Sequence, residues 1–327
     1  MKYFLTGATG FVGGCVAKQL REAGHEVLAL VRTPAQARQL ADLGVGIAQG
    51  DVTNKESMRA PMSGCDGVFH IAGWYKIGVK DSTPGMQVNV HGTRNVLELM
   101  QELGIKRGVY TSTLAVNSDT HGIVRDESYH FNGRHVSEYD RTKALAHEIA
   151  LQFIAKGLGL VIVQPGLVYG PGDQGPAHDF LVQYLTRKLP VVPQRVAYCW
   201  AHVEDVAHGH IQAMEHGKQG ESYFLTGPVH SLLDALHMAR QITGVPLPAL
   251  TAPPLMLHAM SKLMAVFERL VPVPDTYSSE YLRVSAGVTY LGDSSKARRE
   301  LGWSARPLMQ GLTETLEYEM RKLGTLA

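Results

Sequence analysis

A tyrosine and a lysine stand four positions apart in the segment SEYDRTKALAHEIA, residues 137–150. The segment reads as a helix, in which this spacing puts Tyr139 and Lys143 on one face with their Cβ atoms roughly 5–6 Å apart. A free phenol has a pKa of about 10, and a neighbouring ammonium favours its phenolate form. The pair therefore predicts proton transfer, with Tyr139 as the acid or base and Lys143 as the group that lowers its pKa.

Hydroxyl side chains precede this pair in the segment VYTSTLAV, residues 109–116. The apolar start of the segment predicts a strand that ends at Thr111, Ser112 and Thr113. One of these hydroxyls could bind a substrate oxygen opposite the phenol. Tyrosine–lysine pairs are common on solvated helix faces, so the pair alone does not indicate catalysis. It does so only together with these hydroxyls and a cofactor-binding loop elsewhere in the chain.

Such a loop lies near the start of the chain, in FLTGATGFVGG, residues 4–14. Gly7, Gly10 and Gly13 follow an apolar run and open a helical pattern. Glycines at these places allow a tight turn, the approach of backbone to a pyrophosphate, and close packing of helix on strand. Since a helix N-terminus favours phosphate, we predict dinucleotide contacts at Gly7, Thr9, Gly10, Phe11, Val12 and Gly13.

The end of the second predicted strand, ALVRTP, bears on the choice of dinucleotide. A carboxylate here would bind the ribose hydroxyls of NAD. The sequence has Arg32 and Thr33 instead, and the next carboxylate is Asp42. Because a guanidinium can bind a 2′-phosphate bidentately, the pattern favours NADP over NAD. The alternative is a solvated arginine at a strand end.

Strands and helices alternate through the first part of the chain. Strands are predicted at 2–7, 25–32, 44–51, 66–73, 107–113 and 158–170, with helices at 11–23, 34–43, 54–61 and 86–103. This alternation predicts an α/β fold with a doubly wound parallel sheet of the Rossmann type. We expect residues 1–170 to form the dinucleotide-binding domain, to which the chain returns near 195–228. Residues 171–194 and 229–327 are expected to form a smaller, mostly helical substrate-binding region.

The composition excludes several classes of protein. With 327 residues, 45% hydrophobic residues and a formal net charge of +1, the chain can bury a core and offers no electrostatic case for a nucleic-acid partner. Its three separated cysteines predict neither disulfides nor a zinc site. His202, His208 and His210 point three ways on a helix, so no metal is expected. A cytoplasmic protein without a signal peptide or transmembrane segment is the expectation.

A methionine-rich segment occupies residues 253–271. Met256, Met260 and Met264 recur at four-residue spacing, and Lys262 together with Glu268 excludes a simple membrane span. The segment is expected to pack in a core or a dimer interface. Two alternatives are an apolar wall over the substrate and a helix lying on a membrane surface.

Together these features resemble the short-chain dehydrogenase/reductase superfamily in its extended branch, over nearly the whole chain. The resemblance is carried by TGATGFVG (6–13), GDVTN (50–54), HIAG (70–73), NVHGTRNVLE (89–98), YDRTK (139–143), PGLVYGPGD (165–173), HVEDVAHGH (202–210) and DSSKARRELGW (293–303). Within the NAD-dependent epimerase/dehydratase family, ALVRTP and VYTSTLAVN look most like the dihydroflavonol-reductase and 3β-hydroxysteroid-dehydrogenase-like group.

The resemblance implies further roles. Cofactor contacts would fall at Asp51 and Val52 (adenine), Ala72 and Gly73 (the strand end beside the cofactor), Lys143 (nicotinamide ribose), and Pro165 and Val168 (carboxamide). Asn89 would lie near the site. The catalytic hydroxyl aligns best with Thr113, and Ser112 is the second choice. A homodimer formed through the helices near 86–103 and 138–156 is also implied.

We therefore expect an NADPH-dependent reductase of a ketone or aldehyde on a mainly hydrophobic small molecule, reversible as an alcohol dehydrogenase. Substrate contacts are predicted at Trp74, Tyr75, Leu114, Tyr169 and Tyr184. The alternatives are a nucleotide-sugar epimerase and a non-catalytic NADP(H)-binding sensor. Leu114 and Ala115 stand where sugar-nucleotide dehydratases carry an Asp-Glu pair, which argues against water elimination.

Overall fold

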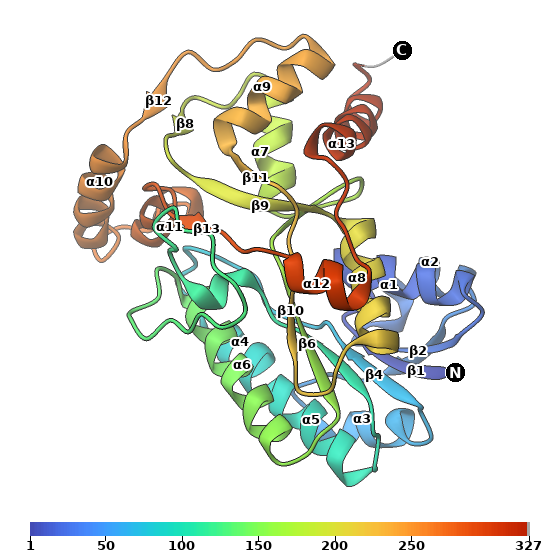
Figure 1. The fold of residues 1–327 in the computed structure, drawn as a ribbon. Helices are drawn as coiled ribbons and strands as arrows, with labels where there is room; N and C mark the ends of the chain where they lie inside the picture. Colours follow the sequence, from blue (N-terminus) through green and yellow to red (C-terminus); the bar gives the residue numbers. More distant parts are fainter. Residues whose placement is uncertain (326–327) are drawn as a thin grey trace.

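The computed structural model describes residues 1–325, and its largest element is a seven-stranded sheet (Figure 1). Its strands, in the order β10-β6-β5-β4-β1-β2-β3, are β1 (Lys2–Thr6), β2 (Glu26–Val31), β3 (Gly46–Gln49), β4 (Gly67–His70), β5 (Gly108–Thr111), β6 (Leu160–Pro165) and β10 (Ser222–Leu225). All neighbouring strands are parallel. The predicted doubly wound α/β fold is confirmed.

Helices cover both faces of this sheet. One face carries α1 (Phe11–Glu22), α2 (Arg38–Asp42), α8 (Val203–His216) and α12 (Ser295–Leu301); the other carries α3 (Lys55–Met62), α5 (Thr93–Glu102) and α6 (Glu138–Ala155). The first face buries Val16, Leu20 and Leu301 against the sheet, and the second buries Leu97 and Phe153. Each layer is therefore held by apolar side chains on one stripe of each helix.

Two predicted helices differ from the structure in detail. Residues 34–43 form a 3₁₀ turn, η1 (Pro34–Gln36), followed by the short α2. A helical stretch at residues 86–103 begins as the π-helix η2 (Met86–Gly92) and continues as α5, with the short α4 (Thr83–Gly85) before it. A π-helical segment inside a longer helix is rare and often occurs at functional sites.

The strand predicted at 158–170 is two strands in two sheets. β6 ends at Pro165, and β7 (Leu167–Tyr169) pairs with β9 (Ala197–His202) of a second sheet. Between them, a Cβ added at Gly166 would lie 2.1 Å from the carbonyl oxygen of Cys199. The chain can therefore cross at this point only because Gly166 has no side chain.

The C-terminal part surrounds this second sheet. It contains α7 (Pro176–Leu185), β8 (Val192–Pro193), β11 (Val229–Ser231), α9 (Leu232–Thr243), β12 (Thr251–Ala252), α10 (Pro254–Phe267), η4 (Asp275–Tyr277), α11 (Ser279–Val284), β13 (Thr289–Tyr290) and α13 (Leu308–Lys322). Its apolar cluster includes Leu181, Leu236 and Leu312. α10 lies at the periphery (Figure 1). Among residues 1–325 no helix combines the length and apolar character needed to span a bilayer. The division into two regions stays a prediction.

Candidate active site

The predicted tyrosine and lysine lie in the first two turns of α6. The helix begins after Ser137, whose hydroxyl accepts a hydrogen bond from the backbone N–H of Asp140. One turn beyond Tyr139, the ammonium of Lys143 is buried and donates to the carbonyl oxygen of Thr111 at 2.8 Å. The cap of α6 therefore places both side chains beside the C-terminal end of β5.

Burial sets the protonation of both groups. Burial lowers the pKa of Lys143 to about 7, so the lysine releases its proton easily. Burial raises the pKa of Tyr139, and the side chain of Thr113 acts in the opposite direction. In this state the phenol is protonated at neutral pH, as a proton donor must be.

The two candidate hydroxyls after β5 point to different partners. The hydroxyl of Ser112, which is buried, lies 2.8 Å from Nδ1 of the partly buried His147 on α6. The hydroxyl of Thr113 accepts from the backbone N–H of Ala115 at 3.2 Å at the start of the 3₁₀ turn η3 (Leu114–Asn117), and it interacts with Tyr139. Thr113 is therefore the hydroxyl beside the phenol.

His147 is a site residue that the sequence reasoning missed. It stands four residues after Lys143 and eight after Tyr139, so the helical spacing that identified the pair also points to it. Burial lowers the pKa of His147 to about 4, and the nearby Lys143 acts in the same direction. A neutral imidazole here fixes Ser112, and with it the end of β5, to α6.

A second neutral histidine, His70 at the end of β4, lies near Lys143. Nδ1 of His70 lies 2.8 Å from the hydroxyl of Thr6, and Nε2 lies 3.0 Å from that of Thr93. Burial, with Lys143 nearby, lowers the pKa of His70 to about 3. The ring stacks on Tyr110 at 5.6 Å between centroids, and Nζ of Lys143 lies 5.0 Å from the centre of the Tyr110 ring. The motif HIAG thus contains a positioning residue to which the sequence analysis gave no role.

Asn89 connects the loop after β4 to α6. Its side-chain oxygen accepts from the backbone N–H of Trp74 at 2.7 Å, and its nitrogen donates to the carbonyl of Trp74 and to the hydroxyl of Thr142, both at 3.0 Å. This clamp positions Tyr75, whose ring meets that of Tyr139 edge to face at 4.5 Å between centroids. Asn89 therefore lies near the site, on the π-helix η2.

The five predicted substrate residues lie in three different places. Tyr75 contacts the phenol, and Trp74 packs over Gly85 beside it. Leu114 is buried in a cluster with Phe224. Tyr169 and Tyr184 are buried in the apolar cluster of the C-terminal part, where the hydroxyl of Tyr184 donates to the carbonyl of Val245. The contacts of these last two tyrosines are those of core residues, which spacing alone could not distinguish from pocket residues.

A buried carboxyl next to Tyr139 connects α6 to the C-terminal part. Asp140 accepts from the hydroxyl of Ser137 at 2.6 Å and from the hydroxyl of Tyr290, on β13, at 2.9 Å. Burial raises the pKa of Asp140 to about 7, while the two hydroxyls lower it and the charge of Glu280 raises it. Tyr290 in turn stacks on Tyr198 of β9.

This carboxyl predicts a pH-dependent stability. The pKa of Asp140 rises from 3.8 to about 7 on folding, so between these values the folded state holds a proton that the unfolded state has lost. Asp140 therefore contributes a fall in stability as the pH rises through this window, with a slope of up to ~1.4 kcal/mol per pH unit, while the lowered pKa values of His70 and His147 contribute slopes of the opposite sign. The lowered pKa of Lys143 acts from about 7 upward, where the unfolded state binds the extra proton and stability rises with pH. Urea unfolding at a series of pH values measures both slopes.

Asp140→Asn is expected to remove only the carboxyl's contribution, so that below pH 7 stability rises more steeply with pH than in the wild type, and to leave the slope above pH 7 unchanged. The amide keeps the size of the side chain and has no charge to bury. If the variant and the wild type show the same slope in the acid window, another group is responsible.

The glycine loop has the shape of a phosphate cradle. Gly7 has φ +80°, and a Cβ added at Gly13 would lie 2.1 Å from the carbonyl oxygen of Gly7. A Cβ at Gly10 would meet only that same oxygen, at 3.2 Å, and otherwise open space. Gly10 caps α1 without a side-chain hydrogen bond, and the first turn holds no acidic residue. These residues fit a dinucleotide pyrophosphate, because no side chain caps the N-terminus of α1 and no acidic side chain in its first turn would repel a phosphate.

The other predicted cofactor residues lie along the same edge of the sheet. The chain runs from β1 to β2 and β3 on one side and then crosses back to β4 on the other side of β1, and this reversal of strand order creates the crevice where such sheets bind nucleotides. Arg32 follows β2 and is exposed. The remaining positions are Thr9, Phe11 and Val12 at the start of α1, Asp51 and Val52 after β3, Ala72 and Gly73 after β4, Pro165 at the end of β6 and Val168 on β7. Asn95, which the sequence reasoning missed, donates to the carbonyl of Val52 at 2.8 Å.

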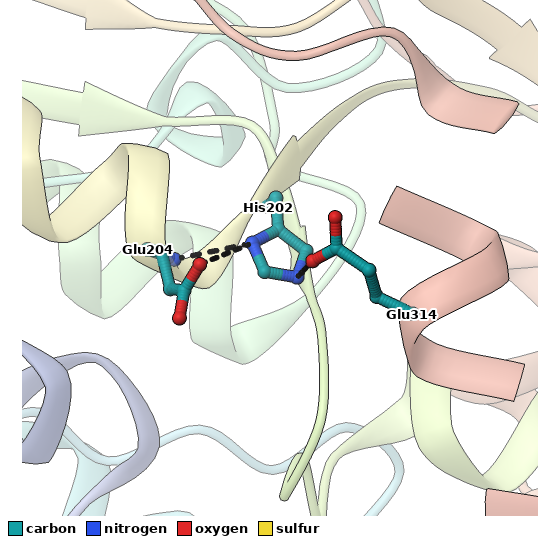
Figure 2. Close-up of side chains that lie close together, drawn as sticks. All are labelled: His202, Glu204 and Glu314. Carbon is teal, nitrogen blue, oxygen red and sulfur yellow. Dashed lines mark hydrogen bonds and ion pairs between the residues drawn. The ribbon is translucent and has the colours of Figure 1, made fainter. Parts of the chain in front are cut away.

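Away from this edge, His202, Glu204 and Glu314 bring three possible metal ligands within 4.8 Å of one another (Figure 2). The guanidinium of Arg306 already binds both carboxylates, donating to Glu314 at 2.6 Å and to Glu204 at 3.0 Å. It also pairs with Asp205. A metal ion would have to displace this arginine. We therefore interpret the cluster as an ion-pair network that holds α8 against α13.

Comparison with known proteins places these observations in a family. The family model described as "NAD dependent epimerase/dehydratase family" matches residues 3–225. A Synechocystis protein with the provisional name dihydroflavonol 4-reductase is 34% identical over 97% of this chain and 94% of its own. A Stigmatella aurantiaca protein named 4-hydroxy-2-methyl-3-oxo-4-farnesyl-3,4-dihydroquinoline-1-oxide ketoreductase is 31% identical over 94% of this chain and 92% of its own.

Among solved structures, that of gox2253 superposes with a TM-score of 0.86 at 30% identity, over 99% of both chains. The match confirms the Rossmann-type fold, and the two reductase-named relatives agree with the resemblance seen in the motifs. The chain belongs to the NAD-dependent epimerase/dehydratase family and is an NAD(P)-dependent oxidoreductase of the extended short-chain dehydrogenase/reductase type.

Proposed function

We propose that the protein is an NADPH-dependent reductase of a ketone or aldehyde carried on a mainly hydrophobic small molecule. The observation that carries this proposal is the triad at the end of β5. Tyr139 lies beside the hydroxyl of Thr113, and Lys143 is buried one turn further along α6. Acid, orienting hydroxyl and lysine thus meet at the edge of the sheet where the glycine loop opens.

Each residue has one task in the reaction. The bound dinucleotide supplies the reducing equivalents. The hydroxyl of Thr113 donates a hydrogen bond to the carbonyl oxygen, which orients the substrate. Tyr139 donates its proton to that oxygen as negative charge develops there. Lys143, when protonated, stabilises the phenolate that remains and would also bind the nicotinamide ribose.

The side chains around the phenol favour a hydrophobic substrate with a ring. Tyr75 lies against Tyr139, and the stacked rings of Tyr198 and Tyr290 lie close to the neighbouring Asp140. Aromatic rings supply large apolar contact areas, and each buried methylene of a substrate adds about 0.8 kcal/mol. The farnesylated quinoline in the name of the Stigmatella relative fits this preference.

A panel of substrates tests the proposal. Loss of NADPH absorbance is measured with aryl, steroid and long-chain ketones and with nucleotide sugars. A reductase consumes NADPH with the hydrophobic ketones, and its kcat/KM rises with their apolar area. An epimerase converts a nucleotide sugar without net consumption of NADPH, and a sensor binds NADPH without turnover. Either of these last results contradicts the proposal.

Arg32→Ala tests the choice of NADP over NAD. We expect NADPH binding to weaken by about 1.5–3 kcal/mol, the range for a hydrogen bond to a charged group, with NADH binding nearly unchanged. Arg240→Ala, an exposed arginine on α9, serves as the control and should change neither affinity. Calorimetric titration measures both cofactors. Equal losses for NADPH and NADH would show that Arg32 does not contact the 2′-phosphate.

A further inference from the structure

α10 presents a continuous apolar face to solvent. Leu255 is 82% exposed and Leu263 is 70% exposed, and Met256, Met260, Val266 and Phe267 are each at least 41% exposed. At 3.6 residues per turn these six side chains lie within a sector of about 140°. The opposite side of the helix holds its buried residues, Leu257 and Ser261. Met256 and Met260 therefore face solvent, whereas Met264 packs against a core cluster with Leu257 and Leu282.

The charged residues beside this face are positive. Between residues 254 and 274 they are Lys262, Glu268 and Arg269. Lys262 and Arg269 are exposed along one edge of the apolar sector. Glu268 accepts hydrogen bonds from the backbone N–H and the hydroxyl of Ser279, at 2.9 and 2.6 Å, and is thereby turned toward α11. The apolar face thus has a cationic border on one side.

A basic cavity of about 420 Å³ adjoins the N-terminal end of α10. Pro254 and His258 from the helix line it together with Arg134, Arg195 and Arg283. Within residues 1–325 no carboxylate forms an ion pair with these three arginines. Arg283 is held by a 2.8 Å hydrogen bond from its Nε to the carbonyl of Val136. The cavity therefore concentrates positive charge that the protein itself does not neutralise.

Other charged groups at this cavity and at a second cavity, unlike the three arginines, have charged partners. The one carboxylate that lines the cavity, Asp119, accepts from the backbone N–H of Thr289 and pairs with His121. In the larger cavity of about 900 Å³ on the chain, Arg298 and Arg306 pair with Asp293 and Asp205. Arginines without such partners are suited to bind an oxyanion in bidentate fashion.

We propose that α10 docks the protein on the surface of a bilayer with anionic headgroups. The apolar sector enters the boundary between headgroups and acyl chains, as in other interfacial helices. Lys262 and Arg269 meet the lipid phosphates, and the basic cavity, whose α10 residues Pro254 and His258 lie outside the apolar sector, adds to the positive field beside them. A second copy of the chain is a poorer occupant of this face. A two-fold interface brings the same patch of both subunits together, so the cationic border of one subunit would meet the cationic border of the other.

Vesicle co-sedimentation of the full chain tests this proposal without reference to its catalytic activity. We expect binding to vesicles of phosphatidylcholine and phosphatidylglycerol, and at least tenfold weaker binding to phosphatidylcholine alone. Leu263→Glu with Phe267→Glu should reduce binding to the anionic vesicles at least tenfold. Leu43→Glu, an exposed leucine after α2, is the matched control and should bind as the wild type does. Lys262→Glu with Arg269→Glu should remove the preference for anionic vesicles.

The altered side chains are exposed, so thermal unfolding should be unchanged, which separates loss of docking from loss of folding. Sedimentation velocity of the same variants measures the oligomeric state. If the wild type ignores vesicles and forms a dimer that Leu263→Glu with Phe267→Glu dissociates, the face is a subunit interface and the proposal is overturned. Equal binding to both kinds of vesicle overturns the assignment of anionic headgroups.

Discussion

Replacing Tyr139 with Phe lowers kcat by about 10²–10⁴-fold, the contribution of a general acid, and leaves NADPH affinity unchanged. The phenylalanine keeps the ring and its edge-to-face contact with Tyr75, so the shape of the site is preserved. Only the proton donor is lost. Single-turnover oxidation of NADPH and calorimetric titration of the cofactor measure the two quantities on the same preparations.

Tyr75→Phe is the matched control, because it removes a phenol hydroxyl from the ring that contacts Tyr139. We expect this variant to keep most of its turnover. If Tyr139→Phe retains near-normal turnover, or if both variants lose it equally, the acid lies elsewhere and the proposed mechanism is wrong.

The second large effect concerns the glycine loop, where two positions have opposite surroundings. A Cβ at Gly13 would lie 2.1 Å from the carbonyl oxygen of Gly7, so Gly13→Ala must displace backbone. We expect a loss of unfolding free energy of about 1–3 kcal/mol, as in other overpacked sites, together with loss of dinucleotide binding. At Gly10 the backbone is extended, with φ −89°, and an added Cβ would meet one atom, the carbonyl oxygen of Gly7, at a tight 3.2 Å.

Gly10→Ala should therefore cost less stability than Gly13→Ala, but should weaken dinucleotide binding because the new methyl group enters the cradle. Thermal unfolding and cofactor titration of both variants separate the two roles. Normal dinucleotide affinity in Gly10→Ala would show that the pyrophosphate does not approach this turn.

The parts of the site that the sequence predicts are those set by local spacing. Tyr139 and Lys143 share a helix face because they are four residues apart, and the glycine loop follows directly from its place between β1 and α1. Six of the seven parallel strands follow from the alternation of apolar runs and helical patterns, because a crossover between parallel strands has a fixed hand; for β10 the sequence predicted only that the chain returns to this domain near 195–228.

What spacing could not predict depends on residues that are distant in sequence. The predicted strand 158–170 is interrupted after Pro165, where the carbonyl oxygen of Cys199 lies close to Gly166. Only the folded chain brings these two residues together. The partner of Asp140 is Tyr290, from the other end of the chain. Tyr184 is an aromatic residue of the kind that lines pockets, but it is buried in the apolar cluster of the C-terminal part, where its hydroxyl donates to the carbonyl of Val245.

The position of β10 in the large sheet has a consequence for synthesis on the ribosome. This strand, Ser222–Leu225, covers the edge of β6, whose six residues are all buried in the finished protein. Until residue 225 has left the exit tunnel, the nascent chain carries β6 as an open, apolar edge. Such edges pair readily with other chains. Completion of the sheet, and with it protection of this edge from pairing with other chains, thus comes late in translation.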